Sequence, residues 1–224
     1  MLLRAGLGWL CCAFCLSLGW AAEPVSLSFE AAAAELKQGG YVVLMRHAQT
    51  EPGVGDPANF RLSDCSTQRN LSVQGREHSR QLGEGLRRLG VQPSAVFSSA
   101  WCRCLDTGAE AFTEGLGSSS AKLKVEVLPI INSFFGDAEA GRLQTVKLRD
   151  WVIATPLKDA ALGANKNKLI WLVTHQVNIT ALTGYYVQMG EAVALKLPVK
   201  LPVSSGATLA PLTPAFRFIA AGKN

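Results

Sequence analysis

Residues 41–50 read YVVLMRHAQT, an apolar run that stops abruptly at Arg46 and His47. Five successive apolar residues predict a strand that is buried on both faces of a sheet. Residues 168–175, KLIWLVTH, repeat this design far away in the chain, because another apolar run ends directly before His175. We therefore expect two buried strands that each carry an imidazole at the carboxyl end.

The segments around these two runs alternate between strand and helix patterns. Strands are expected at 41–45, 95–97, 124–128 and 168–174, with weaker candidates at 207–210 and 216–220. Helices are expected at 29–37, 72–89, 101–112, 139–153 and through Ile179, Leu182 and Tyr185. Strands that alternate with helices predict an α/β fold in three layers, with flanking helices on a mostly parallel central sheet. The Gly/Ser linker at 115–120 is too short to divide domains, so a single domain is expected.

Composition excludes several classes of protein. Of 224 residues, 48% are hydrophobic and 17% are charged, which is typical of a globular chain and not of a disordered one. The net charge of +5 comes from dispersed residues without a basic run, so no nucleic-acid partner is expected. The three histidines lack metal-ligand spacing, and there is no glycine-rich nucleotide loop and no GxSxG motif. No metal and no cofactor are therefore expected.

The first 22 residues have the layout of a secretory signal peptide. A positive start at Arg4 precedes the apolar stretch AGLGWLCCAFCLSLGW, and small residues follow near Ala21 and Ala22. An uncleaved anchor is the alternative, but the stretch is short for a membrane span and no stop-transfer segment follows. We expect residues 23–224 to form the mature domain, periplasmic or secreted, without a stable membrane anchor.

Three cysteines remain after this segment is set aside, namely Cys65, Cys102 and Cys104. In an exported protein two of them could form a disulfide bond, which leaves the third buried or free. We prefer the pair Cys65–Cys102, although the sequence alone does not determine connectivity.

Polar residues follow a third expected strand as well. Ser98 and Ser99 end the strand at 95–97, and Arg103 lies one helical turn later, so it can lean back toward the sheet. Ligands of open α/β sheets bind outside the carboxyl ends of the strands. Two imidazoles and two guanidiniums would then converge, and their mutual repulsion favours a multiply charged anion such as a phosphoryl group. The third histidine, His78, lies inside an expected helix and is assigned to packing or the surface.

A family resemblance rests on four motifs in order: Arg46-His47-Ala48-Gln49-Thr50, Asn70-Leu71-Ser72 with Gly75, Ser98-Ser99 with Arg103, and Thr174-His175. This set resembles the histidine phosphatase superfamily, the phosphoglycerate mutase-like group, on its phosphatase branch. The matching order extends from about Tyr41 to Tyr186. The resemblance implies a central sheet with flanking helices and a covalent phosphohistidine intermediate.

The resemblance also implies roles for individual residues. His47 matches the nucleophile, Arg46 and Arg103 match the phosphate clamps, and His175 matches the second histidine at the transferring phosphoryl group. Arg69 is a further candidate phosphate contact. Gln176 and Asn178 are near the pocket by adjacency alone.

The chain departs from the family pattern at two positions. Ala48 stands where the family has Gly, which is a small change. The second departure concerns the proton donor, because Asn132 occupies the position of a family Glu and an amide does not supply a proton to an alkoxide. Substitutes from neighbouring loops are Asp137, which we prefer, then Glu51 and Asp64.

The sequence therefore predicts an exported, metal-independent phosphatase of small phosphorylated substrates. It would hydrolyse a phosphomonoester through a phosphohistidine on His47, and the substrate could be a phosphorylated sugar of the cell envelope. A phosphomutase, a non-catalytic phosphate binder and a structural envelope protein remain open as alternatives. Retention of both His47 and His175 favours the enzyme, whereas Asn132 favours the binder.

Overall fold

The computed structural model describes residues 23–53, 55–114, 123–158, 168–198 and 211–219. The expected signal peptide at 1–22 and the expected strand at 207–210 lie outside these ranges. Seven strands form one sheet in the order β1-β7-β6-β2-β5-β3-β4. Their bounds are β1 Val25–Ser26, β2 Tyr41–Arg46, β3 Ala95–Ser98, β4 Val125–Val127, β5 Leu169–Thr174, β6 Glu191–Lys196 and β7 Phe216–Ile219.

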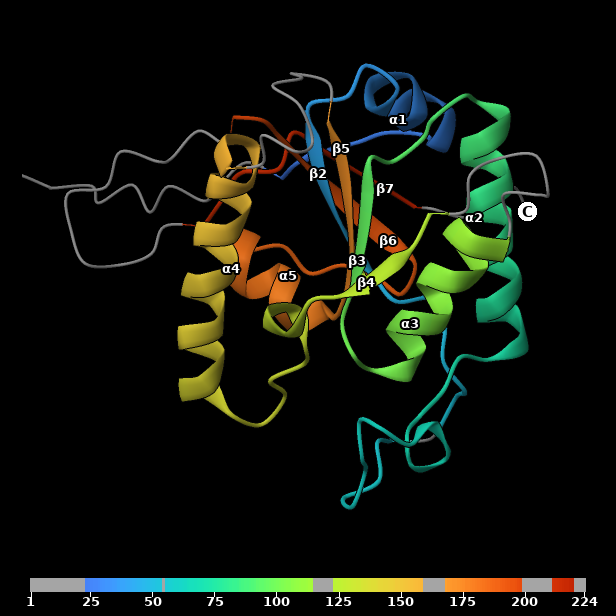
Figure 1. Ribbon diagram of the computed structural model, residues 1–224, viewed down its shortest axis with the longest axis vertical. Coiled ribbons are helices and arrows are strands. Elements are labelled where there is room, and N and C mark those ends of the chain that lie inside the picture. Colours follow the sequence, from blue (N-terminus) through green and yellow to red (C-terminus); the bar gives the residue numbers. More distant parts are fainter. Residues whose placement is uncertain (1–22, 54, 115–122, 159–167, 199–210, 220–224) are drawn as a thin grey trace, which may run out of the picture.

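Helices cover both faces of this sheet (Figure 1). The α-helices are α1 Phe29–Leu36, α2 Val73–Arg88, α3 Cys102–Ala109, α4 Ala138–Lys158 and α5 Gln176–Thr183. Shorter helical turns are η1 Cys65–Thr67, η2 Glu110–Glu114 and η3 Pro129–Ile131. The predicted three-layer α/β fold with a mostly parallel sheet is confirmed, because only β6 runs against its neighbours.

The apolar run of β2 is buried on both faces, as its sequence predicts. Tyr41, Val43 and Met45 pack with α1, α2 and α3 on one side of the sheet. Val42 and Leu44 pack with α4 and α5 on the other side. Full burial of such a side chain contributes about 1.5–3 kcal/mol, so this strand anchors both layers.

A serine and a glycine set two helix boundaries. The Ser72 hydroxyl accepts the amide hydrogen of Gly75 and so caps the start of α2, as expected from the sequence. Helix α5, which begins directly after His175, stops at Thr183 because Gly184 takes the left-handed conformation with φ +81°. Tyr185, which was expected inside this helix, therefore lies beyond it.

Strand β6 was not predicted. Its sequence, EAVALK, consists largely of strong helix formers, so local propensity argues against a strand. Antiparallel pairing with β2 and β7 nevertheless buries every residue of it except Lys196. Tertiary pairing overrides propensity here.

Candidate active site

A cavity of about 410 Å³ opens at the carboxyl ends of β2 and β5 and at the start of α3. It is lined by Arg46, His47, Gly55, Asp56, Arg69, Arg103, Ser133, Phe135, His175, Gln176 and Val177. The register of the two strands pairs Arg46 with Thr174, and the His47 amide donates to the Thr174 carbonyl oxygen at 2.9 Å. This pairing brings the two imidazoles together, with ring centroids 5.5 Å apart.

The His47 imidazole is held neutral and in one tautomer. Its side chain is 3% exposed, and Nδ1 lies 2.8 Å from the Ala48 carbonyl oxygen. A carbonyl oxygen only accepts, so the proton must be on Nδ1 and the lone pair on Nε2. The pKa of His47 is lowered to about 3, mainly by burial and further by the charges of Arg103, Arg46 and Arg69, although the Ala48 hydrogen bond acts in the opposite direction. Nε2 is therefore available as a nucleophile.

A hydrogen-bond chain sets the tautomer of His175. The Ala100 amide donates to Asn132 Oδ1 at 2.8 Å, which identifies that atom as oxygen. The Ser99 hydroxyl, 3.0 Å from the same oxygen, then donates to it as well. Its own oxygen lies 2.9 Å from His175 Nε2 and is left to accept, so Nε2 carries the proton and Nδ1 the lone pair. Asn132 thus orients His175 through Ser99.

Three of the lining residues are arginines with unsatisfied donors. The Nε atoms of Arg46, Arg69 and Arg103 are buried and have no hydrogen-bond partner among the described residues. Arg46 is held by the Val187 carbonyl oxygen, 2.9 Å from its Nη1. The Arg103 guanidinium lies over the Trp101 ring at 4.3 Å. Buried, unpaired donors on fixed cations suit an anion with several oxygens.

One carboxylate also faces the cavity. Asp56 Oδ1 lies 2.8 Å from Arg103 Nη1 and accepts the amide hydrogen of Arg69 at 3.2 Å. The Asp56 side chain is 25% exposed, whereas that of Arg103 is 4% exposed. Asp56 therefore forms an ion pair with Arg103, one of the arginines that an anion would contact.

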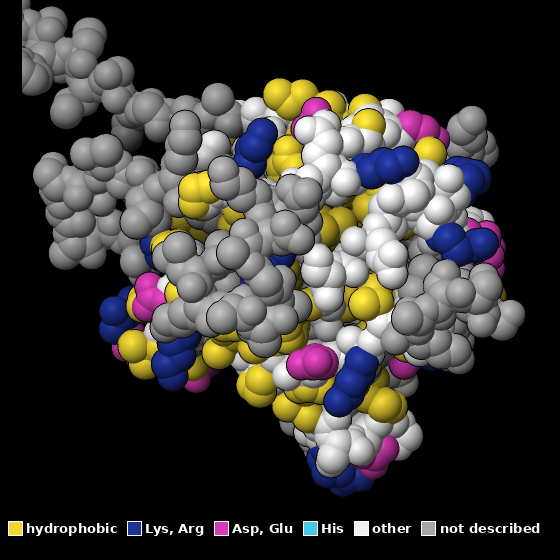
Figure 2. All heavy atoms as spheres, turned by 45° about the horizontal axis from the view of Figure 1, so that its top comes forward, with side chains coloured by type: hydrophobic (Ala, Val, Ile, Leu, Met, Phe, Trp, Pro, Cys, Tyr) yellow, Lys and Arg dark blue, Asp and Glu magenta, His cyan; other side chains and the backbone are white. Residues whose placement is uncertain are grey.

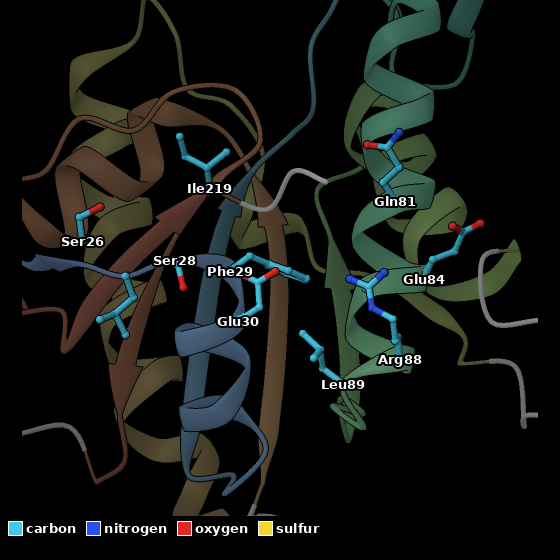
Figure 3. A pocket seen from close by; sticks show the side chains of 11 residues that line it. Ser26, Ser28, Phe29, Glu30, Gln81, Glu84, Arg88, Leu89 and Ile219 are labelled. Atoms are coloured by element: carbon cyan, nitrogen blue, oxygen red, sulfur yellow. The ribbon is translucent and has the colours of Figure 1, made fainter. Parts of the chain in front are cut away.

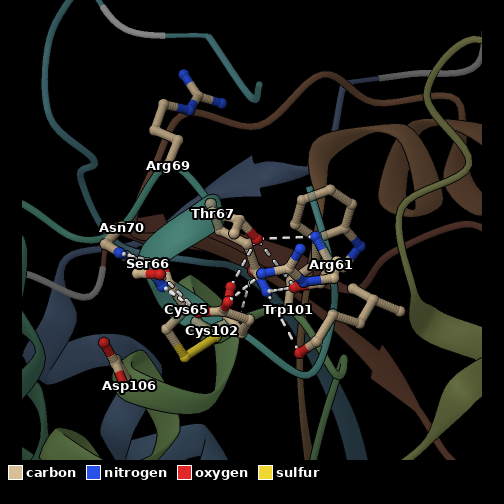
Figure 4. The surroundings of a disulfide bond; sticks show 12 residues. Arg61, Cys65, Ser66, Thr67, Arg69, Asn70, Trp101, Cys102 and Asp106 are labelled. Carbon is tan, nitrogen blue, oxygen red and sulfur yellow. Dashed lines mark hydrogen bonds and ion pairs between the residues drawn. A yellow bond between two sulfur atoms is a disulfide. The ribbon is translucent and has the colours of Figure 1, made fainter. Parts of the chain in front are cut away.

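The loop that carries Asp56 and Arg69 is tied to α3 by a disulfide bond. Cys65 and Cys102 are joined, with Cα atoms 5.7 Å apart, and this is the pairing preferred from the sequence (Figure 4). Phe60 of the loop packs on Trp101, with ring centroids 4.4 Å apart. These two attachments position the loop beside the cavity.

The structure brings five of the predicted residues to this cavity: Arg46, His47, Arg69, Arg103 and His175. Gln176 lines it as well, whereas Asn178 donates to the backbone oxygens of Ile131 and Asn132 and so supports the Asn132 segment.

None of the three predicted proton donors is among the lining residues. The Asp137 side chain accepts the Ala140 amide hydrogen at the start of α4. Asp64 pairs with Arg61, and Glu51 is exposed. Asp137 as proton donor stays a prediction from sequence. Sequence reasoning missed Asp56, because its place in a long loop carries no spacing signal.

The third histidine, His78, and the free cysteine, Cys104, do not line the cavity. His78 is exposed on α2, in agreement with its assignment to packing or the surface. The free Cys104 is fully buried, with Sγ 3.5 Å from His175 Nε2. Burial raises the pKa of the Cys104 thiol to about 12, so it stays protonated and is a poor nucleophile.

A second hollow of about 700 Å³ lies between β1, α1 and α2 (Figure 3). Glu30, Glu84 and Arg88 line it together with Phe29 and Leu89, and it contains neither of the two imidazoles of the first cavity. On the face shown in Figure 2, separate groups of Lys and Arg lie among acidic and uncharged side chains. The histidines and arginines that the sequence predicts for the site, Arg46, His47, Arg69, Arg103 and His175, line the first cavity and not this second hollow.

The described part of the chain lacks two features. No group of three His, Cys, Asp or Glu residues within it could hold a metal ion. No helix within it is long and apolar enough to span a membrane.

The fold and the cavity define an α/β protein with a neutral histidine and an arginine-lined anion site at the carboxyl ends of parallel strands. Residues 42–151 match the family model of the histidine phosphatase superfamily, branch 1. The matched segment contains Arg46, His47, Arg69 and Arg103, and its family is the one that the sequence motifs resemble.

Solved structures share the fold at low identity. One is a mycobacterial glucosyl-3-phosphoglycerate phosphatase in complex with VO3, 19% identical, with a TM-score of 0.51 over 70% of this chain and 93% of that one. Another is a protein titled mycobacterial hydrolase 2, 17% identical, with a TM-score of 0.53 over 82% of this chain and 92% of that one. No curated protein matches the sequence significantly.

Proposed function

We propose that this chain is an exported phosphatase that hydrolyses a phosphomonoester through a phosphohistidine on His47. The observation that carries the proposal is the neutral His47, which lines a cavity together with three arginines whose buried Nε atoms have no hydrogen-bond partner among the described residues. A phosphate binder needs the cations, but it does not need a neutral imidazole among them. The match of residues 42–151 to the histidine phosphatase family model supports the same chemistry.

The reaction would proceed in two transfers. In the first, His47 Nε2 attacks phosphorus while the bond to the ester oxygen breaks, and Arg46, Arg69 and Arg103 neutralise the phosphoryl oxygens. In the second, water attacks the phosphohistidine and releases phosphate. Fixed guanidiniums supply the positive charge that a metal ion provides in other phosphatases, so we propose that turnover needs no metal.

Export is supported by two independent features. The layout of residues 1–22 is typical of a signal peptide. The Cys65–Cys102 disulfide is of the kind that persists in oxidising compartments. An exported enzyme meets phosphorylated sugars of the cell envelope, and we propose this substrate class. The Phe135 side chain at the cavity is 89% exposed, which leaves an apolar ring for the organic part of a substrate.

A non-catalytic binder is the second candidate, and Asn132 in place of an acid favours it. A mutase is less attractive, because it must retain and rebind a phosphorylated intermediate. The discriminating experiment is hydrolysis of 4-nitrophenyl phosphate in the presence of a chelator, by the wild type and by His47→Ala. An aryl leaving group needs little protonation, so the assay does not depend on the proton donor.

Chelator-resistant turnover that disappears in His47→Ala would support the phosphatase. A wild type that binds inorganic phosphate but does not turn over would favour the binder. The matched arginine control is Arg61, which pairs with Asp64 on the surface. Arg69→Ala should weaken phosphate binding about 10–100-fold, since charge-assisted hydrogen bonds contribute about 1.5–3 kcal/mol, whereas Arg61→Ala should not.

A further inference from the structure

The proposed reaction lacks an assigned proton donor. An alkoxide that leaves from phosphorus needs a proton, and the Asn132 side chain does not supply one because its amide oxygen already accepts from Ala100 and Ser99. His175 is also a poor source, because burial and the neighbouring His47 and Arg103 hold its pKa well below the usual value. The donors expected from the sequence, Asp137, Glu51 and Asp64, do not line the cavity, whereas another carboxyl group does.

Among the described residues that line the cavity, Asp56 is the one with a carboxyl group. Its Oδ1 atom is placed by Arg103 Nη1 and by the Arg69 amide, both of which belong to the anion site. The disulfide between Cys65 and Cys102 holds the same loop against α3. The carboxyl group thus lies beside the arginines that would hold the phosphoryl group.

Substrate and Asp56 compete for Arg103. In the structure the carboxylate pairs with this buried guanidinium, as a phosphoryl oxygen would. When a phosphate dianion enters, the carboxylate loses its cation and faces a second anion. Two negative groups at contact distance repel each other, and a proton that the substrate monoanion or the solvent supplies to the pair removes this repulsion.

We infer that Asp56 is the proton donor of the reaction and that substrate binding releases it from Arg103; this inference rests on the proposed phosphatase activity. In the first transfer the bond between phosphorus and the ester oxygen breaks as the His47 Nε2–phosphorus bond forms. The Asp56 proton goes to the leaving oxygen, which departs as an alcohol. In the second transfer the Asp56 carboxylate takes a proton from the attacking water, the phosphorus–nitrogen bond breaks, and phosphate leaves.

The test compares two leaving groups. Wild type and Asp56→Asn are assayed with an alkyl phosphate, such as a sugar phosphate or glycerol phosphate, and with 4-nitrophenyl phosphate. Asn keeps the shape and the acceptor for the Arg69 amide but holds no transferable proton. We expect kcat for the alkyl phosphate to fall about 100-fold or more, the typical contribution of a general acid, and kcat for the aryl phosphate to change less than about five-fold.

Two further variants sharpen the result. Glu51→Gln removes an exposed carboxylate of the same loop and should leave both activities within about two-fold of wild type. Asp56→Glu restores a carboxyl group and should recover part of the alkyl activity. Circular dichroism and thermal unfolding show whether each variant is folded.

Equal losses for the two substrates in folded Asp56→Asn would assign Asp56 to loop positioning and overturn the inference. An unchanged rate for the alkyl phosphate would overturn it as well. Neither result would affect the proposed function, since the wild type would still turn over. If the wild type hydrolyses neither substrate, the proposed function itself fails.

Discussion

His47 Nδ1 and the Ala48 carbonyl oxygen lie 2.8 Å apart, so a residue next to the nucleophile in the chain determines which of its nitrogens can attack. The contact uses a backbone oxygen, and any residue at position 48 provides one. Ala48 in place of the family Gly therefore leaves this tautomer control intact.

The first prediction concerns acid stability. The pKa of His47 is lowered to about 3 in the fold, whereas an unfolded histidine takes up its proton near pH 6.5. Between these values the unfolded state binds more protons, so the free energy of unfolding should decrease as the pH falls from about 6.5 toward 3. The replacement His47→Gln should make this slope shallower by up to about 1.4 kcal/mol per pH unit.

Urea unfolding at several pH values, without phosphate, measures both slopes. ¹⁵N NMR of the imidazole should show neutral His47 with its proton on Nδ1 at pH 5. Equal slopes for the wild type and His47→Gln would contradict the depressed pKa.

The second prediction concerns Asn132 and the tautomer of His175. Asn132→Asp still offers an oxygen to Ala100 and Ser99, so the proton should stay on His175 Nε2. Asn132→Leu removes the acceptor, and the Ser99 hydroxyl is then free to donate to Nε2, which moves the proton to Nδ1. Imidazole ¹⁵N shifts distinguish the two tautomers. If Asn132→Leu keeps the wild-type pattern, Asn132 does not position His175.

The third prediction compares two glycines of α2. A Cβ atom on Gly75 would collide with the backbone oxygen of Gln49, and one on Gly83 would collide in the same way with that of Ala111. Both Ala variants should lose about 1–3 kcal/mol of stability. Gln49 follows the nucleophile segment, so only Gly75→Ala should also displace His47, and we expect kcat to fall about ten-fold or more.

The measurement is kcat for an aryl phosphate at a temperature at which both variants are folded. Gly83→Ala is the control for the steric cost alone. Similar kcat values in the two folded variants would show that contact with Gln49 does not position the site.

The fourth prediction concerns the Cys65–Cys102 disulfide, which joins residues 37 apart in sequence. Closure of a loop of this length restricts the unfolded chain, so the double replacement by Ser should lower the free energy of unfolding by about 2–4 kcal/mol. Because the loop carries Asp56 and Arg69, KM should rise as well. Reduction of the wild type with dithiothreitol should reproduce both effects. Unchanged stability and KM after complete reduction would contradict a positioning role for the bond.

Local sequence was sufficient for the framework of the site. The apolar runs of β2 and β5 are long enough to require burial on both faces, and the strand tips with Arg46, His47 and His175 follow from them. Arg103 could be placed because a helical turn fixes its offset from Ser99. Strand β6 could not be predicted, because its helix-forming residues become a strand only through pairing with β2 and β7.

The sequence by itself determined the three-layer α/β class and the place of Arg46, His47, Arg103 and His175 at the anion site, since burial patterns, strand ends and helical turns are local properties; Arg69 followed from the family resemblance. Only the tertiary structure decided that Asp56 faces this site, that Asn132 orients His175 through Ser99, and that Cys65 rather than Cys104 pairs with Cys102. The physical reason is that each of these contacts joins segments more than 30 residues apart, and no local preference specifies which distant partners the folded chain brings into hydrogen-bonding or bonding distance.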